Sequence, residues 1–186
     1  MNNSSLTFVL GGAKSGKSEF AEHLYSRKER ICYIATGVVK NPDGEMQLRI
    51  QRHQARRSNK WITREQYQHV DELINNSQQD GYLLDDAIML VTNLFYDLVL
   101  AKTSPEKIDD YLESASSQEI ATVILAAVRV NNQSMVIVSD EVGLGVVPAT
   151  KQTRILRDLY GEVNQLIAKE ADNVYFVISG IAQKLK

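Results

Sequence analysis

The segment LGGAKSGKSEF, residues 10–20, gathers residue types that bind phosphate groups. Gly11, Gly16, Lys17 and Ser18 satisfy the pattern G-x-x-x-x-G-K-[S/T], with an apolar run before it and an amphipathic run after it. A strand that enters such a loop and a helix that leaves it are the context that this motif requires. We therefore expect the whole loop to line a nucleotide site: Gly11, Gly12, Ala13, Lys14, Ser15, Gly16, Lys17 and Ser18.

Each part of this loop has a chemical role in binding a nucleoside triphosphate. Glycines let backbone N–H groups turn toward phosphate oxygens, and the N-terminus of the following helix adds the positive end of its dipole. Lys17 would place a full positive charge beside the β- and γ-phosphates, and the hydroxyl of Ser18 would bind Mg²⁺. Lys14 either adds charge to the loop or is solvated.

Acidic residues at the ends of two apolar runs are candidates to complete the metal site. A carboxylate at the end of a neighbouring strand usually orients the magnesium ion or its waters. The run GYLLDD ends in Asp85 and Asp86, and the run VIVSDE ends in Asp140 and Glu141. Asp85 is the leading candidate and Glu141 the second, while Asp86 and Asp140 also fit ordinary strand-end or helix-capping acids.

A histidine lies among arginines in LRIQRHQARR. His53 has Arg52 beside it, and on a helix Arg49, Arg56 and Arg57 would share its face, because they are three or four residues away. Nearby positive charges lower the pKa of an imidazole and leave a neutral nitrogen nucleophile. An anion-binding structural patch has the same pattern, so these residues alone leave both interpretations open.

Strands and helices that alternate along the chain must position these residues. Short apolar, β-branched runs predict strands at 5–10, 31–36, 81–85, 134–139 and 173–179. Longer runs between them predict helices at 17–28, 45–57, 87–101, 104–130 and 150–172. The last of these has Ile155, Leu159, Val163 and Leu166 on one face. The alternation predicts an α/β fold, in which helices cover both faces of a mostly parallel sheet.

Length and composition narrow the class of protein. At 186 residues, of which 44% are hydrophobic, the chain fits one globular domain spanning 1–186. The net charge of -2 excludes a broadly basic protein that coats nucleic acid. No basic leader precedes the first apolar run, and no run reaches the roughly 20 apolar residues that span a bilayer. With its single cysteine, Cys32, in an apolar run, we expect a soluble cytoplasmic protein with a buried, reduced thiol and no membrane or nucleic-acid partner.

Several segments, in order along the chain, together resemble a known family. They are GGAKSGKSEFAE at 11–22, YIATG at 33–37, DGEMQLRIQRHQARRSNKWITRE at 43–65, LLDDAIMLVTNL at 83–94, DEVGLGVVP at 140–148 and RILRDLYGEVNQLIAKEADNVYFVISG at 154–180. The chain is similar to the bifunctional adenosylcobinamide kinase and adenosylcobinamide-phosphate guanylyltransferase family of cobalamin assembly. Many families share the glycine loop, whereas E-M-x-x-R-I-x-x-H, W-x-T-x-E and E-V-G-x-G-x-V-P are specific.

The resemblance implies two reactions, a RecA-like P-loop fold and a homotrimer. In the first reaction, ATP or GTP phosphorylates the aminopropanol hydroxyl of adenosylcobinamide. In the second, a histidine at the position of His53 attacks the α-phosphate of GTP and carries GMP as a phosphoramidate to the cobinamide phosphate, which gives adenosylcobinamide-GDP. By the same resemblance His53 and Lys17 are catalytic and Ser18 and Asp85 hold Mg²⁺, and the further nucleotide contacts are Thr36, Gly37, Arg49, Arg52, Glu65, Asp85 and Glu141.

The sequence departs from the family's pattern at a few positions. Arg52 stands where many relatives carry a second histidine, Asp140 where they commonly carry Asn, and Asp86 where they favour Cys, and GIA replaces GIP or GLP at 180–182. Two alternatives to the bifunctional enzyme remain. One is that a single activity remains, foremost the guanylyltransferase, and the other is a nucleotide-binding regulatory module without catalysis.

Overall fold

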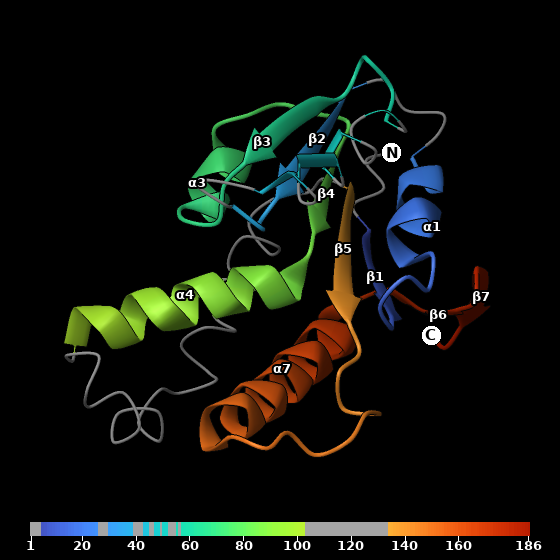
Figure 1. The fold of residues 1–186 in the computed structure, drawn as a ribbon. Coiled ribbons are helices and arrows are strands. Elements are labelled where there is room, and N and C mark those ends of the chain that lie inside the picture. Colours follow the sequence, from blue (N-terminus) through green and yellow to red (C-terminus); the bar gives the residue numbers. More distant parts are fainter. Residues whose placement is uncertain are drawn as a thin grey trace.

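A seven-stranded sheet forms the centre of the protein, with strand order β3-β2-β4-β5-β1-β6-β7 (Figure 1). The computed structural model describes residues 5–25, 30–38, 43–44, 47–48, 50–51, 55, 57–102 and 134–186, with the backbone alone for 98–102. The strands are β1 (Leu6–Gly11), β2 (Ile31–Ala35), β3 (Ile62–Glu65), β4 (Gly81–Asp85), β5 (Ser134–Asp140), β6 (Asn173–Ile178) and β7 (Ile181–Lys184). All neighbouring pairs are parallel except β6 and β7, which form an antiparallel hairpin.

Helices cover both faces of this sheet (Figure 1). The helices are α1 (Lys17–His23), α3 (Val70–Asn75), α4 (Ala87–Lys102) and α7 (Lys151–Glu170). Side chains of α3, α4 and α7 pack with Phe8, Ile34 and Ile137 on one face. On the other face Ala21 of α1 packs with Val9 and neighbouring strand residues. Because β1, β2, β4 and β5 are covered on both sides, their sequences are nearly continuous apolar runs.

The structure confirms the α/β class and all five predicted strands, each within two residues at its ends. The predicted helices at 87–101 and 150–172 are also present, as α4 and α7. The helix predicted at 17–28 is shorter, because α1 ends at His23 with Leu24 as its C-cap. The predicted helix at 104–130 and most of the one at 45–57 lie outside the described residues. Three short elements, β3, α3 and β7, are present without having been predicted from the sequence.

The buried face of α7 is shifted from the predicted one. Leu159 and Val163 are buried as expected, whereas Ile155 and Leu166 are only half-buried at the margin of the core. Leu156, Asn164 and Ile167 complete the buried face. The helix is therefore rotated so that a polar side chain, that of Asn164, reaches the end of β5.

Candidate active site

The glycine loop connects β1 to α1 at the carboxyl end of the parallel strands, where open α/β sheets bind ligands. Lys14 and Gly16 both have a positive φ, at 57° and 93°, and the N–H of Ser15 donates to the carbonyl of Gly12 at 3.1 Å. A Cβ on Gly11 would lie 2.4 Å from the hydroxyl oxygen of Ser15 and 2.7 Å from the carbonyl oxygen of Val177. Glycine is therefore required at this position, as the motif predicts.

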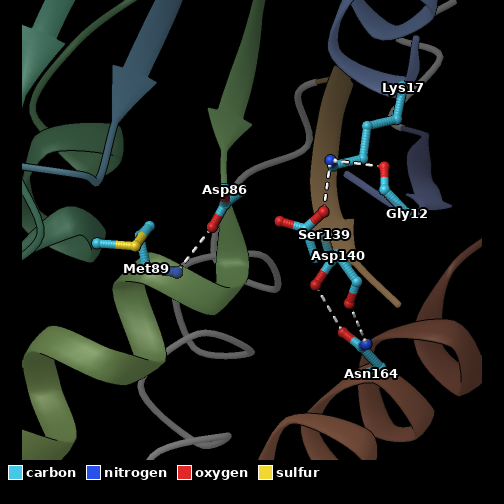
Figure 2. A network of polar contacts seen from close by, with 7 residues as sticks. All are labelled: Gly12, Lys17, Asp86, Met89, Ser139, Asp140 and Asn164. Atoms are coloured by element: carbon cyan, nitrogen blue, oxygen red, sulfur yellow. Dashed lines mark hydrogen bonds and ion pairs between the residues drawn. The ribbon is translucent and has the colours of Figure 1, made fainter. Parts of the chain in front are cut away.

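Lys17 extends back over the loop to a carboxylate on the adjacent strand (Figure 2). Its Nζ lies 2.5 Å from Oδ1 of Asp140 and donates to the carbonyl oxygen of Gly12 at 3.4 Å. Asp140 ends β5 and is in register with Gly11 on β1. Both side chains are largely buried, with 11% of Lys17 and 27% of Asp140 exposed, so the ion pair holds the lysine in place.

Two hydrogen bonds from α7 fix the end of β5 that carries Asp140 (Figure 2). The hydroxyl of Ser139 donates to Oδ1 of Asn164 at 2.7 Å, and Nδ2 of Asn164 donates to the carbonyl oxygen of Asp140 at 3.1 Å. Ser139 is fully buried, which makes these bonds costly to lose. The sequence placed Asp140 behind Asp85 and Glu141 as a candidate, yet Asp140 is the carboxylate that contacts Lys17.

Asp86 lies at the junction of β4 and α4, where it caps the helix (Figure 2). Its Oδ1 accepts a hydrogen bond from the N–H of Met89 at 2.7 Å. Burial raises the pKa of the Asp86 carboxyl to about 6 against the lowering effect of that bond, and the charges of Asp85 and Asp140 raise it further. Because Lys17 also acts on this pKa, Asp86, Asp140 and Lys17 form one electrostatic cluster.

Asp85 is directed toward β2 and is already bound by a neighbour. The hydroxyl of Tyr33 donates to Oδ2 of Asp85 at 2.5 Å. Thr36 is fully buried, and its hydroxyl donates to the carbonyl oxygen of Asp86 at 2.6 Å. The backbone carbonyl oxygen of Thr36 accepts from Nδ2 of Asn93 at 2.8 Å. Gly37 follows at the same edge of the sheet. Thr36, Gly37 and Asp85 are thus brought together where β2 and β4 end.

The remaining acidic candidates face other directions. Oε1 of Glu141 accepts from the N–H of Gly143 at 2.7 Å, so this side chain folds onto its own loop. Glu65 is exposed at the end of β3, and three strands separate it from β1. At about 4.8 Å per strand, this puts Glu65 roughly 19 Å from the glycine loop within one chain. Glu65 is therefore not part of the Lys17 cluster.

Arg57 is the one described member of the arginine set around His53. Its guanidinium carbon lies 3.2 Å from the centroid of the Tyr33 ring, and its Nε lies 3.8 Å from Oε1 of Glu22. Nη1 donates to the hydroxyl of Thr63 at 3.4 Å, and only 8% of the side chain is exposed. The arginine is held inside the protein by these partners. His53, Arg49, Arg52 and Arg56 lie outside the described residues.

Cys32 is buried, as predicted. Trp61, the tryptophan of the W-x-T-x-E segment, is half-buried against the core on the α1 side of the sheet. No helix in the described part of the chain is long and apolar enough to cross a membrane. Within that same part, no group of three or more His, Cys, Asp or Glu side chains is arranged to hold a metal ion.

A glycine loop between β1 and α1, with a lysine held beside a strand-end carboxylate, defines a P-loop nucleotide-binding protein. The fold agrees, since the structure is similar to a prototypical ATPase from the type III secretion system of pathogenic bacteria, with a TM-score of 0.57 and 7% identity, covering 97% of this chain and 56% of that one. The chain belongs to the cobinamide kinase / cobinamide phosphate guanyltransferase family, whose model matches residues 7–185.

Two relatives show how far this similarity extends. The bifunctional adenosylcobalamin biosynthesis protein CobU of Escherichia coli (strain K12) is 39% identical over 97% of this chain and 99% of its own length. The protein of the same name from Salmonella typhimurium is 40% identical over 97% of this chain and 99% of its own. These matches confirm the predicted family and the predicted class of enzyme, a kinase that is also a guanylyltransferase.

Proposed function

We propose that this chain phosphorylates the aminopropanol hydroxyl of adenosylcobinamide and then transfers GMP from GTP to the new phosphate. The observation that carries the proposal is the P-loop with Lys17 held at the strand ends, in a chain that matches the family over residues 7–185. In the first reaction the hydroxyl oxygen bonds to the γ-phosphorus of ATP or GTP. The bond from that phosphorus to the bridging oxygen breaks, the nucleoside diphosphate leaves, and the hydroxyl proton passes to solvent.

In the second reaction the proposed nucleophile is a ring nitrogen of His53. It bonds to the α-phosphorus of GTP, pyrophosphate leaves, and GMP is held as a phosphoramidate. An oxygen of the cobinamide phosphate then attacks the same phosphorus, the P–N bond breaks, and adenosylcobinamide-GDP forms while the histidine is regenerated. Arg49 and Arg52 are proposed to stabilise charge on the transferred group.

Lys17 is proposed to exchange its partner when the triphosphate binds. In the resting protein its ammonium group neutralises Asp140, and the loop's N–H groups and the start of α1 supply further positive potential. When phosphate oxygens arrive they take the place of the carboxylate beside Nζ. The lysine is then already extended and largely buried, which reduces the entropy lost on binding.

Mg²⁺ is proposed to bind between the triphosphate and the oxygen donors of this edge. Ser18 lies in the first turn of α1, and the carboxylate of Asp140 is close enough to raise the pKa of the Asp86 carboxyl. Mg²⁺ commonly takes one or two carboxylates together with phosphates and water, so these donors fit the ion. When bound, it would neutralise charge on the phosphates. Asp85 is the carboxylate that the sequence favoured as the Mg²⁺ ligand. Its hydrogen bond from the Tyr33 hydroxyl would hold it in place at this edge of the sheet.

We also propose that the protein acts as a cytoplasmic homotrimer. Large apolar side chains exposed on the described surface support assembly, since Leu144 is 80% exposed and Val146 91%. The buried, unpaired thiol of Cys32 supports a reducing compartment. Family membership favours both catalytic activities over a single remaining activity or a regulatory module.

The proposal is tested by incubating the protein with GTP labelled at the α-phosphate. We expect label on the protein that is labile in acid and stable in base, and background labelling in His53→Ala. His23→Ala is the matched control, because His23 is an exposed histidine on α1. Absence of label in the wild-type protein, or full labelling of His53→Ala, would overturn the covalent mechanism.

The kinase step is tested separately with Lys17→Ala. Removing the charge that faces the β- and γ-phosphates should lower the phosphorylation of adenosylcobinamide at least about a hundredfold, in line with the loss of other transition-state charge contacts. Lys169→Ala is the control, since Lys169 is an exposed lysine in the last turn of α7, outside the loop. Full kinase activity in Lys17→Ala would show that the loop does not serve phosphoryl transfer.

A further inference from the structure

Arg57 joins three elements at a buried junction beside the P-loop helix. Its guanidinium lies over the ring of Tyr33 on β2, pairs with Glu22 on α1 and donates to Thr63 on β3. Only 8% of the Arg57 side chain and 10% of the Glu22 side chain are exposed. A surface arginine would not have these contacts on three separate elements.

The geometry is specific for arginine. A charge this deeply buried is unfavourable unless opposite charge and polar contacts compensate it, and here Glu22 and the face of Tyr33 supply both. A planar guanidinium can stack on a ring at 3.2 Å while its edge N–H groups reach sideways to Thr63. A lysine ammonium carries the same charge but has no planar group that could stack on the Tyr33 ring.

The junction is connected to the phosphate site on two sides. Glu22 follows Lys17 by five residues in the same helix, so its Cα lies about 7.5 Å further along the helix axis. On the other side, the hydroxyl of Tyr33 donates to Asp85 at the end of β4. The junction therefore borders the phosphate site, through α1 on one side and through Asp85 on the other.

Arg57 is also close to the proposed nucleophile along the chain. It follows His53 by four residues, so the two Cα atoms are at most about 14 Å apart in any conformation of the intervening residues. Whatever holds Arg57 in place therefore limits where the imidazole can be relative to α1. The same buried contacts prevent the Arg57 guanidinium from binding a phosphate group.

We propose that Arg57 is a positioning residue for guanylyl transfer, which fixes the end of the His53-bearing segment against α1 and β2 through Glu22 and the Tyr33 ring. The inference rests on the proposed function, because it takes His53 as the nucleophile. It assigns Arg57 a role different from that of the arginines expected to face the phosphate. The covalent step would depend on the junction, whereas the P-loop chemistry at Lys17 would depend on it less.

The test compares the rate of protein labelling by α-labelled GTP with the rate of the kinase reaction in the same variants. Arg57→Lys keeps the positive charge and removes the planar guanidinium. In this variant the ratio of labelling rate to kinase rate should fall at least about tenfold. Tyr33→Leu removes the ring that carries the guanidinium and should reproduce this fall. Arg30→Lys is the matched control, an arginine whose pair with Asp80 is exposed.

Each outcome decides between the roles. If both rates fall together with the thermal midpoint in Arg57→Lys and Tyr33→Leu, Arg57 is a general stabilising residue and the inference is wrong. Glu22→Gln, which changes only charge, provides a second measurement if either variant fails to fold, and an unchanged ratio there also overturns the inference. A wild-type protein that takes no label overturns the proposed function itself. Labelling of wild type with an unchanged ratio in the variants overturns the positioning role alone.

Discussion

At the scale of single residues, the most informative feature is the concentration of charge around Lys17. Asp140 contacts the ammonium group directly, and Asp86 and Asp85 lie near enough to act on the same electrostatic cluster. One lysine among three carboxylates leaves the resting site short of positive charge for a triphosphate. The loop N–H groups, the helix N-terminus and a divalent cation must supply the remainder.

The burial of Asp86 leads to a prediction about stability and pH. Burial raises the pKa of this carboxyl from 3.8 to about 6, so the folded protein holds the proton more tightly than the unfolded chain does. The stability that comes from protonated Asp86 is complete below about pH 4 and is lost as the pH rises through about 6. Asp86→Asn keeps a neutral cap for Met89 and removes this loss. We expect its stability relative to wild type to rise by about 1 kcal/mol between pH 5 and pH 7.5.

This expectation is checked by urea unfolding of both proteins across that pH range, without nucleotide or magnesium. Asp158→Asn is the control, because 69% of the Asp158 side chain is exposed on α7 and its replacement should give a profile parallel to wild type. Parallel profiles for Asp86→Asn and wild type would show that the Asp86 carboxyl is ionised as easily in the folded protein as in the unfolded chain.

At the scale of elements, the β6–β7 hairpin supports the glycine loop from the side. The N–H of Gly180, in the turn of the hairpin, donates to the carbonyl oxygen of Ser15 at 2.7 Å. A Cβ on Gly16 would lie 3.2 Å from Cα of Gly180, and both glycines have a positive φ. The hairpin and the loop therefore approach at backbone distance, which only glycines permit.

A pair of glycine substitutions tests this contact. Gly16→Ala puts a Cβ into the contact and strains a backbone with φ of 93°, so it should cost about 1–2 kcal/mol of stability and weaken GTP binding. Gly161→Ala is the matched control, since Gly161 lies inside α7 with nothing within 4 Å of the added Cβ. It should stabilise the protein by about 0.5–1 kcal/mol and leave GTP binding unchanged. Denaturant unfolding and titration calorimetry measure the two effects, and equal stability of the two variants would contradict the role of the hairpin.

The elements that the sequence predicted are those with a strong local pattern. The strands covered on both faces are continuous apolar runs, and the P-loop has a motif that fixes its conformation as well as its chemistry. β3 and β7 have only four residues each, three of them exposed, because they lie at the two edges of the sheet. α3 has six residues, too few for a periodic pattern to stand out.

The partner of Lys17 could not be predicted because it depends on the order of strands. GYLLDD and VIVSDE are equivalent as sequences, and each ends a parallel strand in two acidic residues. Only the placement of β5 beside β1, with β4 one strand further away, puts Asp140 at the lysine. Similarly, the burial of Arg57 on Tyr33 joins residues from two strands and a helix, and no local pattern indicates it.

At the scale of the whole molecule, two regions of the described surface each gather several exposed apolar side chains. One is the loop after β5, where Leu144, Val146 and Val147 are 80%, 91% and 68% exposed. The other is the outer edge of the sheet at β7, where Ile181 is 73% exposed and Leu185 60% (Figure 1). Clusters of this kind usually mark contacts with other molecules. The loop begins at the carboxylate that holds Lys17, so a contact there would lie next to the phosphate site.

The proposed trimer leads to a prediction that involves both regions. Sedimentation equilibrium of the wild-type protein should give three times the mass of one chain, because an edge strand and an apolar loop are stabilised when a second copy covers them. Val146→Asp in the loop and Ile181→Asp on β7 each introduce a charge that would be buried in such a contact, and at least one of them should lower the mass to that of a single chain. Gln165→Asp, on an exposed position of α7, adds the same charge outside both regions and should leave the mass unchanged. A wild-type protein that is monomeric at all concentrations would rule out the trimer, and a trimer that survives both substitutions would rule out these two regions as its interface.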